Sequence, residues 1–219
     1  MPLRKVALVE NEFYHIFNRG NSKQTIFHNN SDYERFINLL FISNGSENFK
    51  FQFIGKKNIY EEKRGKPLVG IGAYCLMPNH FHILLIQPKR GNISKFMQKV
   101  STGYSMYFNN KYKHTGSLFE GKFKAEHATS DPYLKYLFSY IHLNPVKLID
   151  KDWKKNGIKN ISNVNSFLNN YKYSSYLDYQ KQNRPQKQLL NIELFPDYFQ
   201  SPKIFREEIF DWLSYRQDL

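Results

Sequence analysis

Apolar and polar positions alternate, or repeat at helical spacing, through most of the chain up to residue 147. Four short aromatic and β-branched runs are typical of strands: 13–20, 68–76, 81–86 and 121–128. Three longer stretches place apolar residues three and four positions apart and predict amphipathic helices: 31–43, 92–112 and 133–144. Residues 49–54 also alternate like a strand, and the polar stretch 55–67 that follows is expected to be a solvated loop.

Cap residues predict where two of these helices begin and end. Ser31 and Glu34 have the spacing of a capping box at the start of the first helix. Ser130 or Asp131 can cap the last one, and Pro145 stops it.

The elements follow one another as strand, helix, strand, strand, helix, strand, helix. This is the split βαβ pattern of ferredoxin-like folds with one helix added. We therefore predict an α+β fold for residues 1–150, a ferredoxin-like antiparallel sheet with helices on one face. Residues 151–219 are rich in Lys and Asn, carry weaker apolar patterns and include an amphipathic stretch at 203–216. We predict that they form a mostly helical C-terminal appendage packed on the first domain.

Two histidines stand at the start of the 81–86 strand, directly after a turn at Pro78 and Asn79. Alternate residues of a strand point to the same side, so His80 and His82 share a face at the mouth of a hairpin. Two imidazoles at this spacing suit one metal ion. A bare His-x-His pair is more often part of a packed strand end, and other parts of the chain must decide between the two interpretations.

A second stripe on the 133–144 helix supplies further candidates. Asn144 lies one turn after Tyr140, so both project from the same face, and its amide oxygen can serve as a third metal ligand. A phenol held beside a cation is a possible nucleophile toward phosphorus. Tyr104 and Tyr107 compete for that role, but both fall on the apolar stripe of their own helix.

The other histidines are expected to have structural or surface positions. His15 could approach the site from a neighbouring strand, although a packed strand histidine is the simpler interpretation. His142 is about 200° around the helix from Tyr140 and is expected to point elsewhere. The remaining three are expected at the surface: His28, His114 and His127.

The chain carries 32 Lys and Arg against 19 Asp and Glu, a net charge of +13 and a pI near 9.6. Such a field favours polyanions, and nucleic acid is the first candidate, although an AT-rich gene would also enrich Lys and Asn. A single cysteine, Cys75, excludes a disulfide within one chain. No apolar run reaches the length of a membrane span, so we expect a cytoplasmic, nucleoid-associated protein without a membrane partner.

Four segments, in this order, resemble the HUH single-tyrosine transposases of small bacterial insertion sequences, and more closely their REP-associated relatives: Tyr14–Gly20, Tyr74–His82, Gly116–Lys124 and Tyr140–Lys147. Residues 173–176 resemble a short motif that these relatives carry further on. The chain departs from the pattern at Glu120, where a glutamine is common, in the insertion 55–67, and in its longer stretch after residue 150.

The resemblance implies a ferredoxin-like fold that binds single-stranded or hairpin DNA. It assigns His80, His82 and Asn144 as metal ligands and Tyr140 as the nucleophile. In such enzymes the tyrosine attacks a DNA phosphate, leaving a 5′-phosphotyrosine and a free 3′-hydroxyl, and a second strand's hydroxyl then reverses the step.

The sequence therefore predicts a metal-dependent DNA strand transferase that uses Mg²⁺ or Mn²⁺, with zinc a possible substitute. A DNA-binding protein of the same fold that does not cleave, and a nuclease that uses a metal-bound water, remain open alternatives. So do a monomer and a homodimer. Four basic residues flank the motifs and are candidate DNA contacts: Arg19, Lys122, Lys124 and Lys147.

Overall fold

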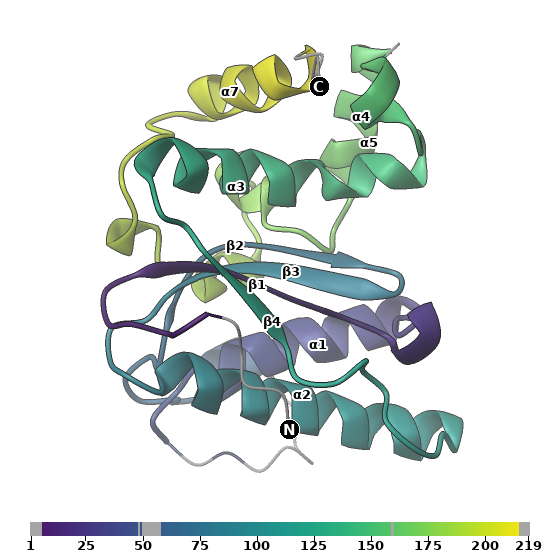
Figure 1. The fold of residues 1–219 in the computed structure, drawn as a ribbon, viewed down its shortest axis with the longest axis vertical. Helices are drawn as coiled ribbons and strands as arrows, with labels where there is room; N and C mark the ends of the chain where they lie inside the picture. Colours follow the sequence, from purple (N-terminus) through teal and green to yellow (C-terminus); the bar gives the residue numbers. More distant parts are fainter. Residues whose placement is uncertain (1–5, 48, 50–57, 159, 215–219) are drawn as a thin grey trace.

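The computed structural model describes residues 6–47, 49, 58–158 and 160–214. Four strands form an antiparallel sheet in the order β2-β3-β1-β4. Their bounds are Phe13–Arg19 for β1, Gly70–Met77 for β2, His80–Ile86 for β3 and Lys124–His127 for β4. Figure 1 shows the resulting ferredoxin-like arrangement, which confirms the predicted fold class. The strand expected at 49–54 lies, apart from Phe49, outside the described residues.

One face of the sheet is covered by α1 (Asn30–Ser43) and α2 (Asn92–Tyr112), whose bounds match the expected helices closely (Figure 1). The odd-numbered side chains of β3 point into this layer. Phe81 there meets Phe36 of α1, with 5.0 Å between ring centroids, and Tyr104 of α2 packs against the same Phe36. Burial of these aromatic side chains is the main source of stability in this layer.

The other face is covered by α3 (Asp131–Leu143) and, beyond it, α7 (Pro202–Ser214) (Figure 1). Helices expected on one face thus cover both. The physical reason is that β3 is apolar on both sides, and Leu84 needs a second layer as much as Leu85 needs the first.

Residues after 150 pack on this second layer and on the edge of β2. They form α4 (Trp153–Asn156), α5 (Ile161–Asn170), α6 (Tyr176–Tyr179) and α7. Between α5 and α6 the chain runs along β2: Leu76 N–H donates to Tyr173 O and Ser175 N–H donates to Tyr74 O, both at 2.9 Å. The division of the chain at residue 150 stays a prediction.

Two local expectations are corrected by the structure. The helix α1 begins one residue after Asn29, whose N–H donates to Asp32 at 3.3 Å, so Ser31 and Glu34 do not form the cap. The strand expected over 121–128 is shortened to β4, because Gly121 has a φ of 137° and its carbonyl accepts a hydrogen bond from the Asn18 side chain.

The described part of the 55–67 stretch is mostly exposed, as expected of a solvated loop, but two of its side chains anchor it to the domain. Ile59 is 3% exposed, and the guanidinium of Arg64 lies 4.1 Å from the Phe41 ring centroid and donates to Phe41 O at 3.0 Å. These contacts attach the segment to the outer side of α1. Within the described part of the chain, every helix is too short or too polar to cross a membrane.

Candidate metal and nucleophile site

The sheet register brings the two motif histidines and three side chains of β1 onto one face. In the antiparallel ladder Arg19 pairs with His80, and Phe17 pairs with His82. Because alternate strand residues share a face, His15 lies on the same side, the side covered by α3. On the next strand, β4, Glu126 pairs with His15, so its carboxylate joins the same face.

The turn before His80 is held in place by the loop that follows β1. Gly20 N–H donates to Asn79 O at 2.8 Å, and Asn79 Nδ2 donates to Lys23 O at 3.2 Å. A side chain at Gly20 would not fit, since a Cβ there would lie 2.2 Å from Gln24 O. The Oδ1 of Asn79 lies 2.6 Å from His80 Nδ1, which fixes the orientation of that imidazole.

The helix α3 positions Tyr140 over this face. It is capped by Ser130, as expected, and its apolar stripe packs on the sheet. The Tyr140 ring therefore stands edge-on to two imidazoles, with centroids 5.5 Å from His82 and 5.6 Å from His15.

Asn144 lies at the end of α3 beside Tyr140, as the sequence predicts. Its side chain is 1% exposed, and its Nδ2 donates to Tyr140 O at 3.0 Å. This bond turns Oδ1 the other way, where it is buried and accepts no hydrogen bond from any described residue. A buried acceptor without a donor is costly, and a cation is one way to satisfy it.

The donor set fits a metal held by two imidazoles and one amide oxygen. Both histidines have Nδ1 in a hydrogen bond, His80 to Asn79 and His82 to His15, so a metal bound by either ring would be bound through Nε2. No group of three or more His, Cys, Asp or Glu side chains in the described ranges is arranged to hold a metal ion. A metal site here therefore depends on the amide of Asn144.

Comparison with known proteins decides the family. The model of a transposase family described as IS200-like matches residues 9–144, more than half of the chain. The chain belongs to the IS200-like transposases. A comparison with curated protein sequences gave no significant match.

A solved structure with the same fold is that of a REP-associated tyrosine transposase bound to a REP hairpin. Its TM-score with this transposase is 0.52 at 10% sequence identity, and the alignment covers 85% of this chain and 90% of that chain. At this identity the likeness establishes the shared fold and no more.

The electrostatic environment of the transposase site keeps His80 neutral and Tyr140 protonated. Burial lowers the pKa of His80 to about 4, with the positive charges of Lys147 and Arg19 acting in the same direction and the Asn144 side chain opposing them. Burial also raises the pKa of Tyr140, an effect that Asn144 partly offsets. His80 thus has a free lone pair at neutral pH, whereas the phenol needs a nearby positive charge to ionise.

Sequence reasoning missed the part played by His15. It is 3% exposed, its Nε2 lies 2.8 Å from His82 Nδ1, and its Nδ1 lies 3.4 Å from the carboxylate of Glu126. The preferred interpretation, a packed strand histidine, describes its burial but not this contact. The signal is non-local, because only the register between β1 and β3 brings the two histidines together.

The competing tyrosines and the remaining histidines lie elsewhere. Tyr104 is fully buried on the opposite face of the sheet, where its hydroxyl donates to Ile26 O, and the Tyr107 hydroxyl donates to Asp32 at 2.9 Å. His142 points away from the site and contacts Ser175 Oγ at 2.7 Å, as its helical position predicts.

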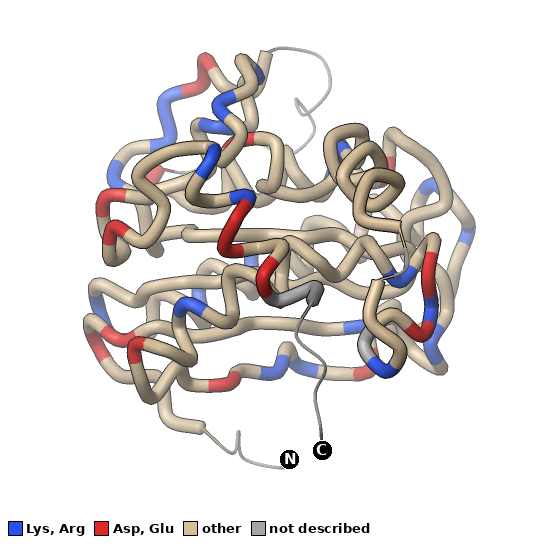
Figure 2. Tube along the Cα trace, turned by 90° about the horizontal axis from the view of Figure 1, so that it is seen from above, with Lys and Arg blue, Asp and Glu red and all other residues tan. Residues whose placement is uncertain are grey.

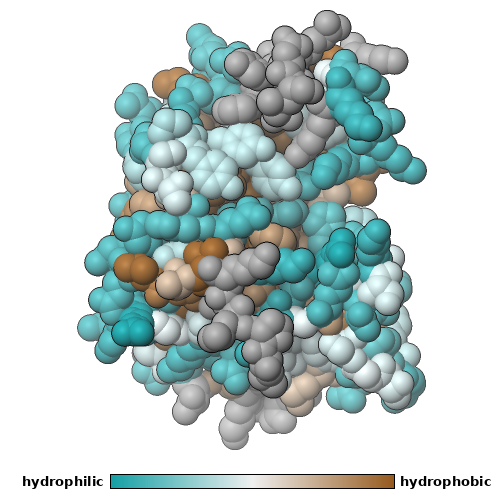
Figure 3. Space-filling model, viewed as in Figure 1, coloured by the Kyte–Doolittle hydropathy of each residue, from teal (hydrophilic) through white to brown (hydrophobic). Residues whose placement is uncertain are grey.

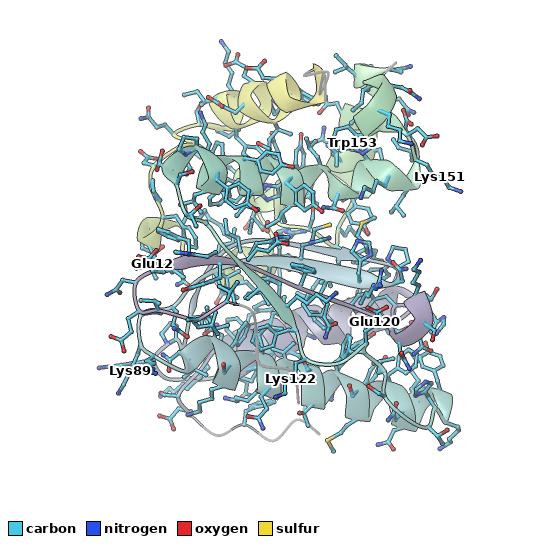
Figure 4. The ribbon with its side chains drawn as sticks, in the orientation of Figure 1. Glu12, Lys89, Glu120, Lys122, Lys151 and Trp153 are labelled. Carbon is cyan, nitrogen blue, oxygen red and sulfur yellow. The ribbon has the colours of Figure 1, made fainter. Side chains whose placement is uncertain are left out.

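The four basic candidates surround the site unequally. Lys124 pairs with Phe17 and shares the face of the histidines, and Lys147 is close enough to influence His80. Arg19 is also on this face, but its Nε is 2.5 Å from the carboxylate of Glu120. Figure 4 places Lys122 in the loop before β4, toward α2 and away from α3. Their contact with DNA stays a prediction.

Lys and Arg are not gathered into one stripe. Figure 2 shows them spread around the chain trace among acidic positions. Net charge therefore does not by itself mark a DNA interface on this molecule, and the site has to be located from its own side chains.

Proposed function

We propose that this transposase cuts and rejoins single-stranded or hairpin DNA through a covalent bond to Tyr140. The observation that carries the proposal is the placement of Tyr140, whose ring lies 5.5 Å from that of His82 on a helix that ends in the unsatisfied Asn144 oxygen. A phenol, two imidazoles and an amide oxygen meet at one end of the sheet. This combination suits transfer of a phosphoryl group to a phenol.

We propose Mg²⁺ or Mn²⁺ as the cation, held by His80, His82 and Asn144. An amide oxygen and the oxygens of a DNA phosphate favour a fairly hard cation, and two imidazoles extend the choice to Mn²⁺. When bound, the cation would withdraw charge from the scissile phosphate and favour the phenolate form of Tyr140. The existing hydrogen bonds of both rings support this role, since neither ring has to be rearranged to present Nε2 to the cation.

The chemistry follows from the position of the phenol. The Tyr140 oxygen loses its proton and attacks phosphorus, an oxygen–phosphorus bond forms, and the bond to the 3′-oxygen breaks. The products are a 5′-phosphotyrosine and a 3′-hydroxyl. Attack on the phosphotyrosine by the 3′-hydroxyl of another strand releases the phenolate and restores a phosphodiester, so one ester bond is exchanged for another and no nucleotide cofactor is consumed.

We take hairpin DNA as the first substrate to test. The solved REP-associated relative is bound to a REP hairpin, and this transposase shares its fold over most of both chains. Arg19, Lys124 and Lys147 border the site and would contact the phosphates on either side of the cut.

A denaturing gel of protein with labelled hairpin or single-stranded DNA and Mn²⁺ tests the proposal. The wild-type chain is expected to give a slow covalent band and Tyr140→Phe none, because the substitution removes the attacking oxygen and keeps the ring. Tyr136→Phe is the matched control, since Tyr136 lies one turn earlier on the same helix stripe, 5.9 Å from the Tyr140 ring. It should form the adduct normally.

The alternatives predict different gels. A DNA-binding protein that does not cleave would shift the DNA on a native gel and give neither adduct nor cut. A nuclease that uses a metal-bound water would cut without an adduct and would tolerate Tyr140→Phe. An adduct that persists in Tyr140→Phe and disappears in Tyr136→Phe would move the nucleophile one turn along α3.

A further inference from the structure

Three side chains contact one another in series behind the site. The carboxylate of Glu126 lies 3.4 Å from His15 Nδ1, and His15 Nε2 lies 2.8 Å from His82 Nδ1. The two imidazoles are stacked, with centroids 5.0 Å apart and an angle of 21° between their planes. His15 and His82 are 3% and 6% exposed, so water does not easily replace the contact between the two rings.

The Glu126 carboxylate determines how the protons are arranged along this series of contacts. A neutral imidazole carries one N–H, and which nitrogen carries it is set by the hydrogen bonds that the ring makes. Glu126 can only accept, so it favours a proton on His15 Nδ1 and leaves His15 Nε2 as an acceptor. His82 Nδ1 must then carry the proton that joins the two rings. Its Nε2 is then the unprotonated nitrogen, the form that binds a metal.

We propose that His15 and Glu126 are positioning residues that hold His82 in the Nδ1–H form, with Nε2 directed to the cation. The inference rests on the proposed metal site, but it concerns residues that touch neither metal nor DNA. Ligating histidines commonly donate their second N–H to a carboxylate or carbonyl. Here a second histidine is placed between the ligand and the carboxylate.

Glu126 is itself held in position from the side of α3. The Tyr133 hydroxyl lies 3.5 Å from the same carboxylate oxygen that faces His15. The hydrogen bond to His15 lowers the pKa of Glu126, so the carboxylate is charged at neutral pH and acts as an acceptor.

The chain contains a matched control. His127, on the same strand as Glu126, contacts the carboxylate of Glu12 at 2.8 Å and stacks on Tyr14, with ring centroids 5.1 Å apart. It is a histidine–carboxylate pair of the same kind on the opposite face of β4. A substitution at His127 therefore reproduces the loss of such a pair without altering His82.

Nitrogen NMR of the histidine rings in the metal-free protein tests the proton arrangement directly. The wild-type chain is expected to have protonated Nδ1 and unprotonated Nε2 in both His15 and His82. In His15→Phe the acceptor for His82 is gone, and the His82 proton should move to Nε2. His127→Phe should leave the His82 signals in place. A wild-type His82 protonated on Nε2, or one unchanged by His15→Phe, would overturn the inference.

Metal affinity provides the second readout, with Mn²⁺ binding followed by electron paramagnetic resonance. Loss of such a supporting contact typically weakens binding by about 10–100-fold, which we expect for His15→Phe. His15→Gln should recover much of the affinity, because its side-chain oxygen can accept from His82 Nδ1. Glu126→Leu should have a smaller effect, since its contact is longer and its side chain is half exposed.

A double substitution separates positioning from general damage. In a His82→Ala background, His15→Phe should cause no further loss of Mn²⁺ affinity, because there is no ring left to orient. An additional loss of the same size would mean that His15 acts on the site by another route and would overturn the inference. If the wild-type chain bound no Mn²⁺, the proposed metal site would fail while the NMR result still decided the arrangement of the histidines.

Discussion

At the scale of single residues, the buried side chain of Asn144 has only half of its hydrogen-bonding groups satisfied. Its amide nitrogen is committed to Tyr140 O, and its oxygen is buried without a donor among the described residues. An unsatisfied buried acceptor costs about 1–3 kcal/mol. Such a cost is commonly found where a polar group is retained for a ligand and not for stability.

Asn144→Ala is therefore expected to leave the metal-free chain about as stable as the wild type, because it removes one hydrogen bond and one unsatisfied oxygen together. Its Mn²⁺ affinity should fall. Thermal unfolding with and without Mn²⁺ measures both effects, since a ligand that binds only the folded state raises the melting temperature. Asn169→Ala, an asparagine on α5 bonded to Asn165, is the control and should keep the full response to Mn²⁺.

Glu120 is a residue at which this transposase differs from the pattern it resembles, and the structure gives it a partner. Its carboxylate lies 2.5 Å from Nε of Arg19, one of the proposed phosphate contacts. In Glu120→Gln the guanidinium is released for a phosphate. We expect DNA affinity at low salt to rise by up to about fivefold, equivalent to about 1 kcal/mol.

The salt dependence identifies the cause of that change. If Arg19 gains a phosphate, the slope of log affinity against log salt should steepen by about 0.7 for single-stranded DNA. Glu208→Gln breaks a comparable ion pair, 2.7 Å from Lys135 between α3 and α7, and should change neither quantity. An unchanged slope in Glu120→Gln would mean that Arg19 does not contact DNA.

At the scale of elements, α3 has Tyr140 on one side and a buried histidine on the other. Its front carries Tyr140, and on its back the fully buried His142 contacts Ser175 Oγ at 2.7 Å. Burial lowers the pKa of His142 to about 3. The unfolded chain therefore binds a proton near pH 6.5 that the folded chain does not accept until about pH 3.

The sign of this linkage predicts loss of stability in acid. The contribution of neutral His142 to the free energy of unfolding is complete above pH 6.5. It is lost as the pH falls toward 3, at up to about 1.4 kcal/mol per pH unit. Urea unfolding of wild type between pH 7 and pH 4 should show this decline, and His142→Gln should show a shallower one. The exposed His28 supplies the control, because His28→Gln should follow the wild-type curve. Equal slopes in all three chains would contradict the assignment.

How far the sequence predicts each element depends on how local its determinants are. Residues 92–112 form the expected helix to the residue, because a long apolar stripe and its flanking turns are sufficient. The predicted cap of α1 was wrong because Asp32, which completes the observed cap, is also held by a distant residue. Lys111, about 80 positions away, donates to it at 2.7 Å. The contact between His15 and His82 could not be predicted for the same reason, since it depends on strand register.

The same distinction applies to the candidate site. Tyr140 and Asn144 share a helix face and His80 and His82 share a strand face, so spacing alone pairs them correctly. The two pairs meet only if α3 lies on one particular side of the sheet. The resemblance implied that side, and α3 lies there in the structure. The unsatisfied state of the Asn144 oxygen has no signature in sequence, because it depends on what surrounds the side chain.

At the scale of the whole molecule, two helical layers enclose the sheet and leave the site at one end of the second layer (Figure 1). Figure 3 shows a patch of side chains of intermediate hydropathy over α3, bordered by more polar surface. The stripe that contains Tyr133, Tyr136 and Tyr140 is only partly buried and lies on this helix. DNA that reached Tyr140 would therefore pass over half-exposed aromatic rings before it met the proposed metal ligands.

The placement of Tyr140 over His82 within a single polypeptide has a genetic consequence. If each site is built from one chain, lesions in its two halves should fall in one complementation group. Chains that carry Tyr140→Phe, coexpressed with chains that carry His80→Ala, should yield no DNA cleavage, because no chain then has both an attacking oxygen and a complete ligand set. If helices were instead exchanged between subunits, mixed dimers would regain one working site and cleavage would return. An inactive variant coexpressed with the wild type should lower the total cleavage activity in proportion to its share of the chains. It should not inhibit the wild-type molecules.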